Sequence, residues 1–364
     1  MQSGKMNLRS VAANVARYTG LLRAAELASS RFEVRQGRIQ RSRTKAVILC
    51  YHRIGTGGVP FYSGLPTLLF EAQMRYVKSH YNVVPLAAVP QLLASGELNE
   101  PAVAVTFDDG YMGTYTEAFP VLRKYDIPAT TYLTVDCIET GRLAWYDRIF
   151  LALQVLEENS FTIDIVGTTC RYELSSPASR LQAALDINRR LRRIPDEDRV
   201  SVVAEIERRI SLPAAAMHRR MLTWDLVRKM QAGGHSFGCH TMTHPAVSRL
   251  RPRQYNYELV QSKQLVEERT GRPALDFAFP FGNPPDCADV GDILPSMGYR
   301  TAATMNYGVN EADTDMFRLF RFAAVEDPVS LLACKLSTLF WTGQSATAPS
   351  PRMFSAEQPK GVNA

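Results

Sequence analysis

The sequence has no closely spaced cysteine pair and no long apolar segment. Its six cysteines are scattered and none forms a CxxC pair, so neither a zinc knuckle nor a disulfide framework is indicated. No apolar stretch reaches the ~18 residues that a membrane-spanning helix requires. The first segment is interrupted by Arg9, Arg17 and Arg23, where a signal peptide needs an apolar centre. These absences predict reduced thiols and a cytoplasmic protein.

A basic bias is also missing from most of the chain. Residues 1–45 carry ten Lys or Arg against two Glu, a net charge of +8, while the rest carries 32 basic and 34 acidic groups, a net charge of −2. The body therefore lacks the positive charge typical of nucleic-acid-binding proteins, and no nucleic-acid partner is expected. Hydrophobic residues make up 46% and charged residues 21%, ordinary values that exclude neither an enzyme nor a binding module.

The N-terminal segment, residues 1–44, combines positive charge with an apolar stripe. Its apolar residues recur at steps of three and four from Leu8 to Ala25, which predicts an amphipathic helix over residues 6–30 followed by a basic, irregular linker. Two interpretations stay open. The stripe packs on the body, which is the commoner case, or residues 6–43 make a peripheral contact with an anionic membrane surface.

From Lys45 onward, segments of strand and helix type alternate. Ala46–Tyr51 and Ala102–Phe107 are continuous apolar runs of strand length, and each is followed by a stretch with helical periodicity. This alternation is typical of parallel βα units. It predicts an α/β fold over residues 45–340.

Two regions depart from this alternation. Residues 138–220 contain a helix, a hairpin around Gly167 and two charged helices, and we interpret them as an insertion. After Gly343 the chain is rich in Ser, Pro, Ala and Gln, which predicts a disordered tail over residues 344–364.

Asp108 and Asp109 stand together directly after the apolar run AVAVTF and before Gly110. For an isolated Asp-Asp-Gly sequence, a loop that caps the next helix is the common interpretation. Two like charges beside a core are costly, however, and α/β barrels place their active sites at the carboxyl ends of parallel strands. Two adjacent carboxylates can also divide the work, because one can hold a metal ion while the other stays free as a base.

Three of the six histidines fall within ten residues, at His235, His240 and His244. A lone histidine is more often structural, but two that are four residues apart can project from one face of a helical turn toward a shared ion. One Asp and two His supply three ligands and leave positions open for water, as in catalytic metal sites. The combination predicts hydrolysis.

A third segment, FAFPFG at Phe277–Gly282, is typical of a strand that ends in a turn. Together, TFDDGY, HTMTH and FAFPFG, in this order, resemble the successive motifs of the NodB-type polysaccharide deacetylases, and the flanking YHRI, LTWDLV and FRLFRF are similar too. The resemblance covers residues 45–325, and it is to the exopolysaccharide-biosynthesis branch of that family. It implies a distorted (β/α) barrel with seven or eight strands.

The resemblance assigns roles residue by residue. Asp109, His240 and His244 match the metal ligands, and Asp108 matches the catalytic base. His52, in the early Tyr-His strand end, matches the histidine that serves as the acid in the exopolysaccharide branch. Without the family, a histidine after a strand is more often structural.

Two departures from the family pattern bear on activity. The arginine that many members carry two residues before the proline of FAFPFG is Ala278 here, which leaves open what orients Asp108. The C-terminal motif that supplies an acid histidine in many members is also missing, since no histidine follows His244.

The wall of the substrate site has four candidates: Tyr111, Trp145, Pro280 and Phe281. Aromatic rings can stack on sugars, although an aromatic residue at a helix start, as at Trp145, is more often part of the core. A backbone N–H near Tyr111 could stabilise an oxyanion.

The resemblance, together with these residues, implies a metal-dependent hydrolase that removes acetyl groups, most of all N-acetyl groups, from an amino-sugar polysaccharide or a glycan precursor. Zinc is the first expectation for the ion, while cobalt, nickel, iron and manganese accept the same ligands. Two alternatives remain: a catalytically inactive sugar-binding relative, and another metal-dependent hydrolase of C–N bonds. A two-metal phosphoesterase would need more ligands than are assembled here.

Overall fold

The structure, a computed structural model, describes residues 45–55, 64–96, 101–210, 220–282, 287, 290–324 and 327–342. The predicted N-terminal helix, its basic linker and the predicted tail lie outside these residues. Within the described ranges, no helix combines the length and the apolar character needed to cross a membrane.

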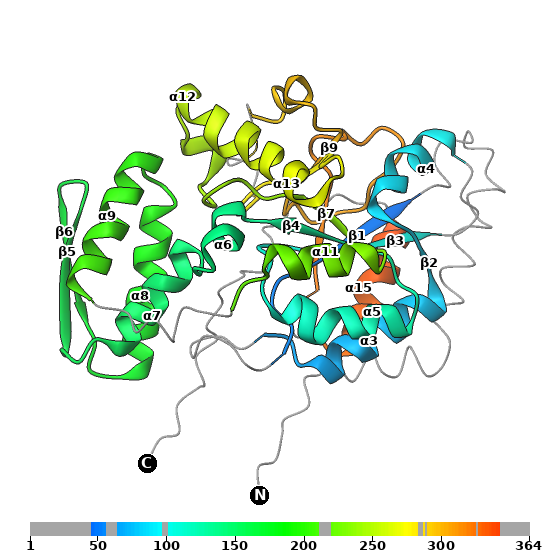
Figure 1. The fold of residues 1–364 in the computed structure, drawn as a ribbon. Coiled ribbons are helices and arrows are strands. Elements are labelled where there is room, and N and C mark those ends of the chain that lie inside the picture. The colour runs from blue at the N-terminus through cyan, green and yellow to red at the C-terminus, as the bar shows by residue number, and fades with distance from the viewer. Residues whose placement is uncertain are drawn as a thin grey trace, which may run out of the picture.

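A curled parallel sheet forms the centre of the molecule (Figure 1). Its strands are β1 (Ala46–Tyr51), β2 (Asn82–Val83), β3 (Ala102–Phe107), β4 (Ala129–Leu133), β7 (Ser236–Cys239), β8 (Asp276–Ala278), β9 (Thr301–Ala303) and β10 (Phe322–Ala323). Their order is β10-β1-β3-β4-β7-β8-β9, and β2 pairs with β3. Ala303 of β9 also bridges Leu319, just ahead of β10, which brings the two ends of the sheet together. The predicted distorted barrel is confirmed.

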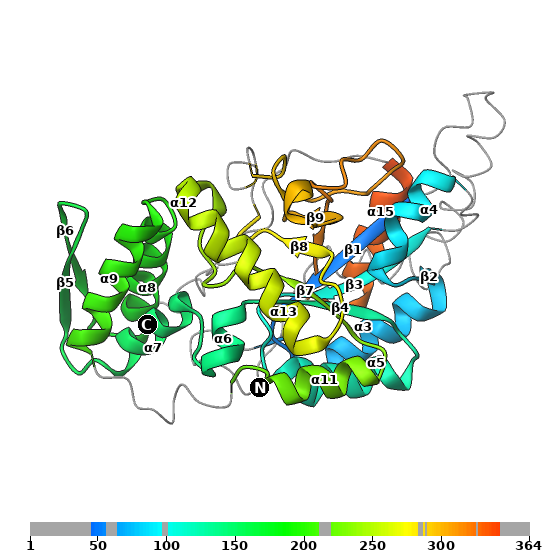
Figure 2. The ribbon, with the colours of Figure 1, turned by 45° about the horizontal axis from the view of Figure 1, so that its top comes forward.

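Helices cover the outside of this sheet (Figure 2). They are α3 (Thr67–His80), α4 (Val89–Ser95), α5 (Phe119–Lys124), α6 (Val135–Thr140), α11 (Trp224–Ala232), α12 (Pro252–Tyr255), α13 (Ser262–Thr270) and α15 (Val329–Thr342). The helix α3 buries Phe70, Met74 and Val77, which lie on one of its faces. The central strands are buried along their whole length, because helices cover a parallel sheet on its outer face while side chains fill the inside of the curl.

Residues 145–209 form a lobe beside the sheet, seen at the left of both ribbon views. The lobe consists of α7 (Trp145–Val155), the antiparallel hairpin of β5 (Ser160–Ile165) and β6 (Thr168–Glu173), α8 (Pro177–Leu191) and α9 (Asp196–Arg209). The hairpin turns through Val166 and Gly167, both with positive φ, as a two-residue turn between twisted strands requires. The predicted helix, hairpin and two charged helices are all observed.

The strand register determines which residues meet at the carboxyl edge of the sheet. Tyr51 at the end of β1 lies opposite Phe107 at the end of β3, so the residues that follow, His52 and Asp108, leave the sheet side by side. In the same way Cys239 of β7 lies opposite both Leu133 of β4 and Phe277 of β8. His240 therefore emerges between two neighbouring strand ends.

Candidate active site

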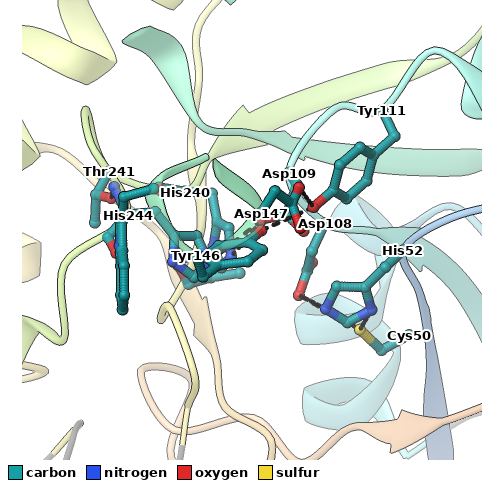
Figure 3. Close-up of polar contacts among 12 residues, drawn as sticks. Cys50, His52, Asp108, Asp109, Tyr111, Tyr146, Asp147, His240, Thr241 and His244 are labelled. Carbon is teal, nitrogen blue, oxygen red and sulfur yellow. Dashed lines mark hydrogen bonds and ion pairs between the residues drawn. The ribbon is translucent and has the colours of Figure 1, made fainter. Parts of the chain in front are cut away.

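Three predicted side chains converge where β3 and β7 end (Figure 3). Oδ1 of Asp109 lies 3.3 Å from Nε2 of His244 and 3.7 Å from Nε2 of His240. All three side chains are buried, and one ligand atom from each lies within 4.8 Å of the others. Oδ1 of Asp109 has no hydrogen-bond partner in the described structure, which is unusual for a buried carboxylate oxygen. This donor set fits a divalent ion, because two imidazoles and a carboxylate are the ligands of catalytic metal sites.

The tautomer of His240 follows from its surroundings. Its Nδ1 lies 2.8 Å from the carbonyl oxygen of Ala278, which can only accept, so Nδ1 donates and Nε2 keeps a lone pair facing Asp109. Burial also lowers the pKa of His240 to about 4, more than nearby Asp108 raises it, so the ring is neutral at pH 7. A neutral imidazole is the form that binds a metal ion.

The turn between the two histidines is fixed by three side chains. The hydroxyl of Thr241 accepts a hydrogen bond from the backbone N–H of His244 at 2.9 Å. Glu258, which is buried, accepts from the backbone N–H groups of Met242 and Thr243 at 3.0 and 2.9 Å. Trp145 donates its indole N–H to the carbonyl oxygen of His244 at 2.9 Å. The histidine spacing is thus set by this turn and not by a helix.

Backbone strain is concentrated at this edge of the sheet. Six non-glycine residues in the described ranges have a positive φ, and four of them belong to the site: Asp109, Thr241, His244 and Phe281. Such a conformation is costly for an L-residue with a side chain and persists where the surrounding structure enforces it.

Asp108 is held by an arginine that the sequence reasoning missed. Nη1 of Arg321, on the segment leading into β10, lies 2.7 Å from Oδ1 of Asp108, and both side chains are buried. Burial alone would raise the pKa of Asp108, but the positive charge of Arg321, together with His240 and His52, outweighs it and holds the pKa below its ordinary value. Arg321 thus orients Asp108 in a chain that has Ala278 at the usual arginine position. An arginine inside the apolar run LFRFAA was the available signal.

His52 lies beside the other oxygen of the same carboxylate. Its Nε2 is 3.7 Å from Oδ2 of Asp108, and the side chain is 28% exposed, against 2% for Asp108. The thiol of Cys50 is 3.4 Å from the same Oδ2, and its sulfur is 4.0 Å from Nδ1 of His52. Of the side chains of His52 and Asp108, that of His52 is therefore the more accessible. Figure 3 shows its ring between Cys50 and Asp108.

The candidates for the substrate wall fall into two groups. Phe281 is half-buried, and its ring stands 4.8 Å from the ring of His244, beside the proposed ligands. Trp145 is 2% exposed and supports the His244 turn, so its ring is packed in protein and offers no open stacking face. Tyr111 is 5% exposed and donates its hydroxyl to Asp147 at 2.7 Å, which places its ring in a buried network. Pro280 is buried.

His235 takes no part in this edge. It precedes β7, at the opposite end of the strand from His240, and its Nε2 lies 2.8 Å from the hydroxyl of Thr131. Burial lowers its pKa to about 3, so it is a neutral core residue.

Comparison with known proteins assigns the family. The family model for polysaccharide deacetylases matches residues 95–302, more than half of the chain. The chain belongs to the polysaccharide deacetylase family. It is accordingly a deacetylase, a hydrolase that acts on carbon–nitrogen bonds, and the family is metal-dependent.

Relatives and solved structures agree with this assignment. YxkH of Bacillus subtilis, which carries a polysaccharide deacetylase name, is 22% identical over 279 residues, covering 76% of this chain and 70% of that protein. The poly-β-1,6-N-acetyl-D-glucosamine N-deacetylase of Escherichia coli K12 is 26% identical over 168 residues, covering 43% of this chain and 24% of that protein.

Two solved structures share the fold of this deacetylase. The Streptococcus pyogenes deacetylase PplD, solved with acetate, superposes with a TM-score of 0.53 at 20% identity, covering 79% of this chain and 96% of that one. IcaB from Ammonifex degensii gives 0.52 at 19% identity, covering 81% and 100%.

Proposed function

We propose that this deacetylase removes N-acetyl groups from an amino-sugar glycan, using two groups of side chains at the carboxyl edge of the sheet. The metal group, Asp109, His240 and His244, holds a divalent ion, with zinc as the first candidate. The acid–base group is Asp108 and His52. One observation carries the proposal: the two groups meet at the adjacent residues Asp108 and Asp109. The carboxylate of Asp109 faces the two imidazoles, and the carboxylate of Asp108 is held by Arg321.

A divalent ion bound there supplies Lewis acidity, which lowers the pKa of a water molecule and polarises the acetyl carbonyl. Asp108 accepts the proton of the attacking water at Oδ2, because Oδ1 is occupied by Arg321. When the bond between the carbonyl carbon and nitrogen breaks, His52 donates a proton to the leaving amine. The products are acetate and a free amino sugar. Asp108 loses its proton to solvent, His52 takes a proton back from solvent, and the acetic acid first formed releases its own proton to become acetate.

The positions of Arg321 and His52 also argue against the alternative that the chain is an inactive sugar-binding relative. That alternative rested on Ala278 and on the absence of a histidine after His244. The guanidinium of Arg321 contacts Asp108 from another strand end, and His52 lies beside the same carboxylate. Both departures thus have a local substitute, which supports an active enzyme.

The choice of an N-acetylated glycan rests on the relatives. Those of Escherichia coli and Staphylococcus epidermidis are named as poly-β-1,6-N-acetyl-D-glucosamine N-deacetylases, and each matches a part of this chain. An acid such as His52 matters most for an amide substrate, because an amine leaves poorly without a proton. Phe281, beside His244, is our candidate for the wall of the sugar site.

Acetate release from matched N-acetylated and O-acetylated oligosaccharides tests the proposal. We expect release from the N-acetylated series that stops when metal is removed and returns when it is restored. Asp108→Asn should lower the rate by about 10²–10⁴-fold with the metal still bound. Asp225→Asn, the same chemical change at a side chain that is 78% exposed on α11, is the control and should be unchanged. Full activity in Asp108→Asn would remove Asp108 as the base.

We also propose a cytoplasmic enzyme that meets a lipid-linked or nucleotide-linked precursor, with residues 6–43 contacting an anionic membrane face. The support is the charge of +8 on residues 1–45 and the apolar stripe of the predicted helix. Deleting residues 1–44 should abolish sedimentation with anionic liposomes. Equal sedimentation of the full and shortened chains would rule out this contact.

A further inference from the structure

A second cluster of metal-ligating side chains lies beside the metal group. Cys50 at the end of β1, His52 just after it, and Asp108 after β3 each offer one ligand atom, and these atoms lie within 4.8 Å of one another. The sulfur of Cys50 is 3.4 Å from Oδ2 of Asp108 and 4.0 Å from Nδ1 of His52. Separations of this size are those of neighbouring ligands around one tetrahedral ion, whose bonds to sulfur and nitrogen are about 2.0–2.3 Å long.

The donor set selects the kind of ion. A thiolate, an imidazole and a carboxylate suit Zn²⁺ and its softer analogue Cd²⁺, and do not suit Mg²⁺ or Ca²⁺, which prefer oxygen ligands. The metal group contains no sulfur, so the two clusters differ in preference. A softer ion such as Cd²⁺ therefore gains more affinity at the cluster that contains Cys50 than a harder ion does, although the metal group remains the stronger site.

The surroundings also set the order of filling. Arg321 places a positive charge 2.7 Å from Asp108, which opposes a second cation at this point. Cys50 is 1% exposed, and burial raises the pKa of its thiol well above the ordinary value, so binding must release the thiol proton to solvent. The metal group has neither an adjacent arginine nor a thiol that must lose a proton, so it binds an ion first. An ion reaches the second cluster past His52, whose side chain is 28% exposed.

We propose that Cys50, His52 and Asp108 form a second, weaker site for a thiophilic divalent ion, and that an ion bound there inhibits the deacetylase. Binding engages Oδ2 of Asp108 and a ring nitrogen of His52, the two atoms that take up and give back protons. Excess zinc or cadmium should therefore stop catalysis without displacing the first ion. The inhibition rests on the proposed function, whereas the binding does not.

Metal titration of the full-length, metal-stripped protein tests the binding. Cadmium added to the wild-type protein should bind in two steps, and the second should bring the near-ultraviolet absorbance of a cadmium–thiolate bond. Cys50→Ser should bind one equivalent and lack this absorbance, while Cys334→Ser, which removes a half-buried thiol on α15, should behave as the wild type. His244→Ala, which weakens the metal group, should keep the thiolate signal.

Thermal unfolding of Cys50→Ser and Cys50→Ala checks that both variants fold, so that a lost equivalent reflects a lost ligand. A wild-type protein that binds one equivalent, or a Cys50→Ser protein that binds two with unchanged absorbance, would overturn the second site. For the inhibition, we compare acetate release at one equivalent and at excess zinc. At excess zinc the wild type should lose most of the activity that it has at one equivalent. Cys50→Ser should release acetate at the same rate under both conditions. Equal loss in both would leave the binding result standing and overturn the inhibition.

Discussion

The metal group and the acid–base group meet at one sheet edge, but they are assembled differently. Asp109, His240 and His244 come from two sequence motifs, and the turn that carries the histidines is fixed mainly by hydrogen bonds with Thr241 and Glu258, which are near in the sequence, with one more from Trp145. Asp108 is oriented by Arg321, which is 213 positions away and directly precedes β10, the last strand, which pairs with the first strand β1. The comparison teaches that the ligands depend on local turns, whereas the base depends on closure of the barrel.

The largest effect is expected from removing the shared carboxylate of the metal group. Asp109→Ala takes away a ligand that lies 3.3 and 3.7 Å from two imidazoles, so both bound metal and activity should be lost. Metal content after dialysis, measured beside acetate release, checks this. An Asp109→Ala protein that kept its metal but lost its activity would contradict the division into a metal group and an acid–base group.

A smaller and selective effect is expected at His52. His52→Gln removes the proposed acid and leaves the metal group intact, so an N-acetylated substrate should slow by about 10²-fold or more. An O-acetylated analogue should slow much less, because an alkoxide leaves more easily than an amide anion. Rates of acetate release from the matched N-acetylated and O-acetylated substrates, for the wild type and His52→Gln, give the two losses to be compared. The same loss on both substrates would argue for a structural role of His52.

Barrel closure can be tested through Arg321. Arg321→Met leaves the buried carboxylate of Asp108 without its partner, and breaking a buried ion pair costs about 3–5 kcal/mol of unfolding free energy. Urea unfolding should show this loss, together with a lower rate of acetate release. The double variant Arg321→Met with Asp108→Asn should recover part of the stability, because no buried charge is then left unpaired. A double variant no more stable than Arg321→Met would show that the loss comes from packing.

The smallest effect concerns the turn of the metal group. Burial raises the pKa of Glu258 to about 7, more than its hydrogen bonds with Thr243 lower it. Because the folded pKa lies above the unfolded value of 4.5, the stability that Glu258 contributes is fully present below about pH 4.5. It is lost as the pH rises through 7, by about 3 kcal/mol. Glu258→Gln, which mimics the neutral acid, should flatten this part of the pH profile of unfolding free energy. If the profile of Glu258→Gln matched that of the wild type, the pH dependence of the unfolding free energy would come from titratable groups other than Glu258.

Much of the barrel could be predicted from the sequence, because its signals are local. Apolar runs such as Ala46–Tyr51 and Ala102–Phe107 are buried along their whole length and can only be central strands of a covered sheet. The adjacent Asp108 and Asp109 stand at the end of one of these runs. Their place at the carboxyl edge therefore followed from the pattern alone.

The missed residues are those that act across long separations. Arg321 reaches Asp108 only when the segment before β10 lies beside β1, a pairing that no periodicity encodes. Glu258 supports the histidine turn from a helix 14 positions beyond His244, and nothing in its neighbourhood marks it as buried. Trp145 was considered for the sugar site because it is aromatic, although its indole N–H serves the turn. Side-chain direction is decided by packing, which the sequence pattern does not contain.

The four residues with positive φ imply a conflict between durability and activity in this enzyme. Each such residue raises the free energy of the folded chain by about 1–3 kcal/mol, and glycine would relieve much of that at Phe281. A search for heat-resistant variants would therefore be drawn to the same edge of the sheet that performs the reaction. Variants found there should tolerate higher temperature and turn over more slowly. Substitutions meant to raise thermal stability without loss of activity are therefore better placed in the lobe of residues 145–209.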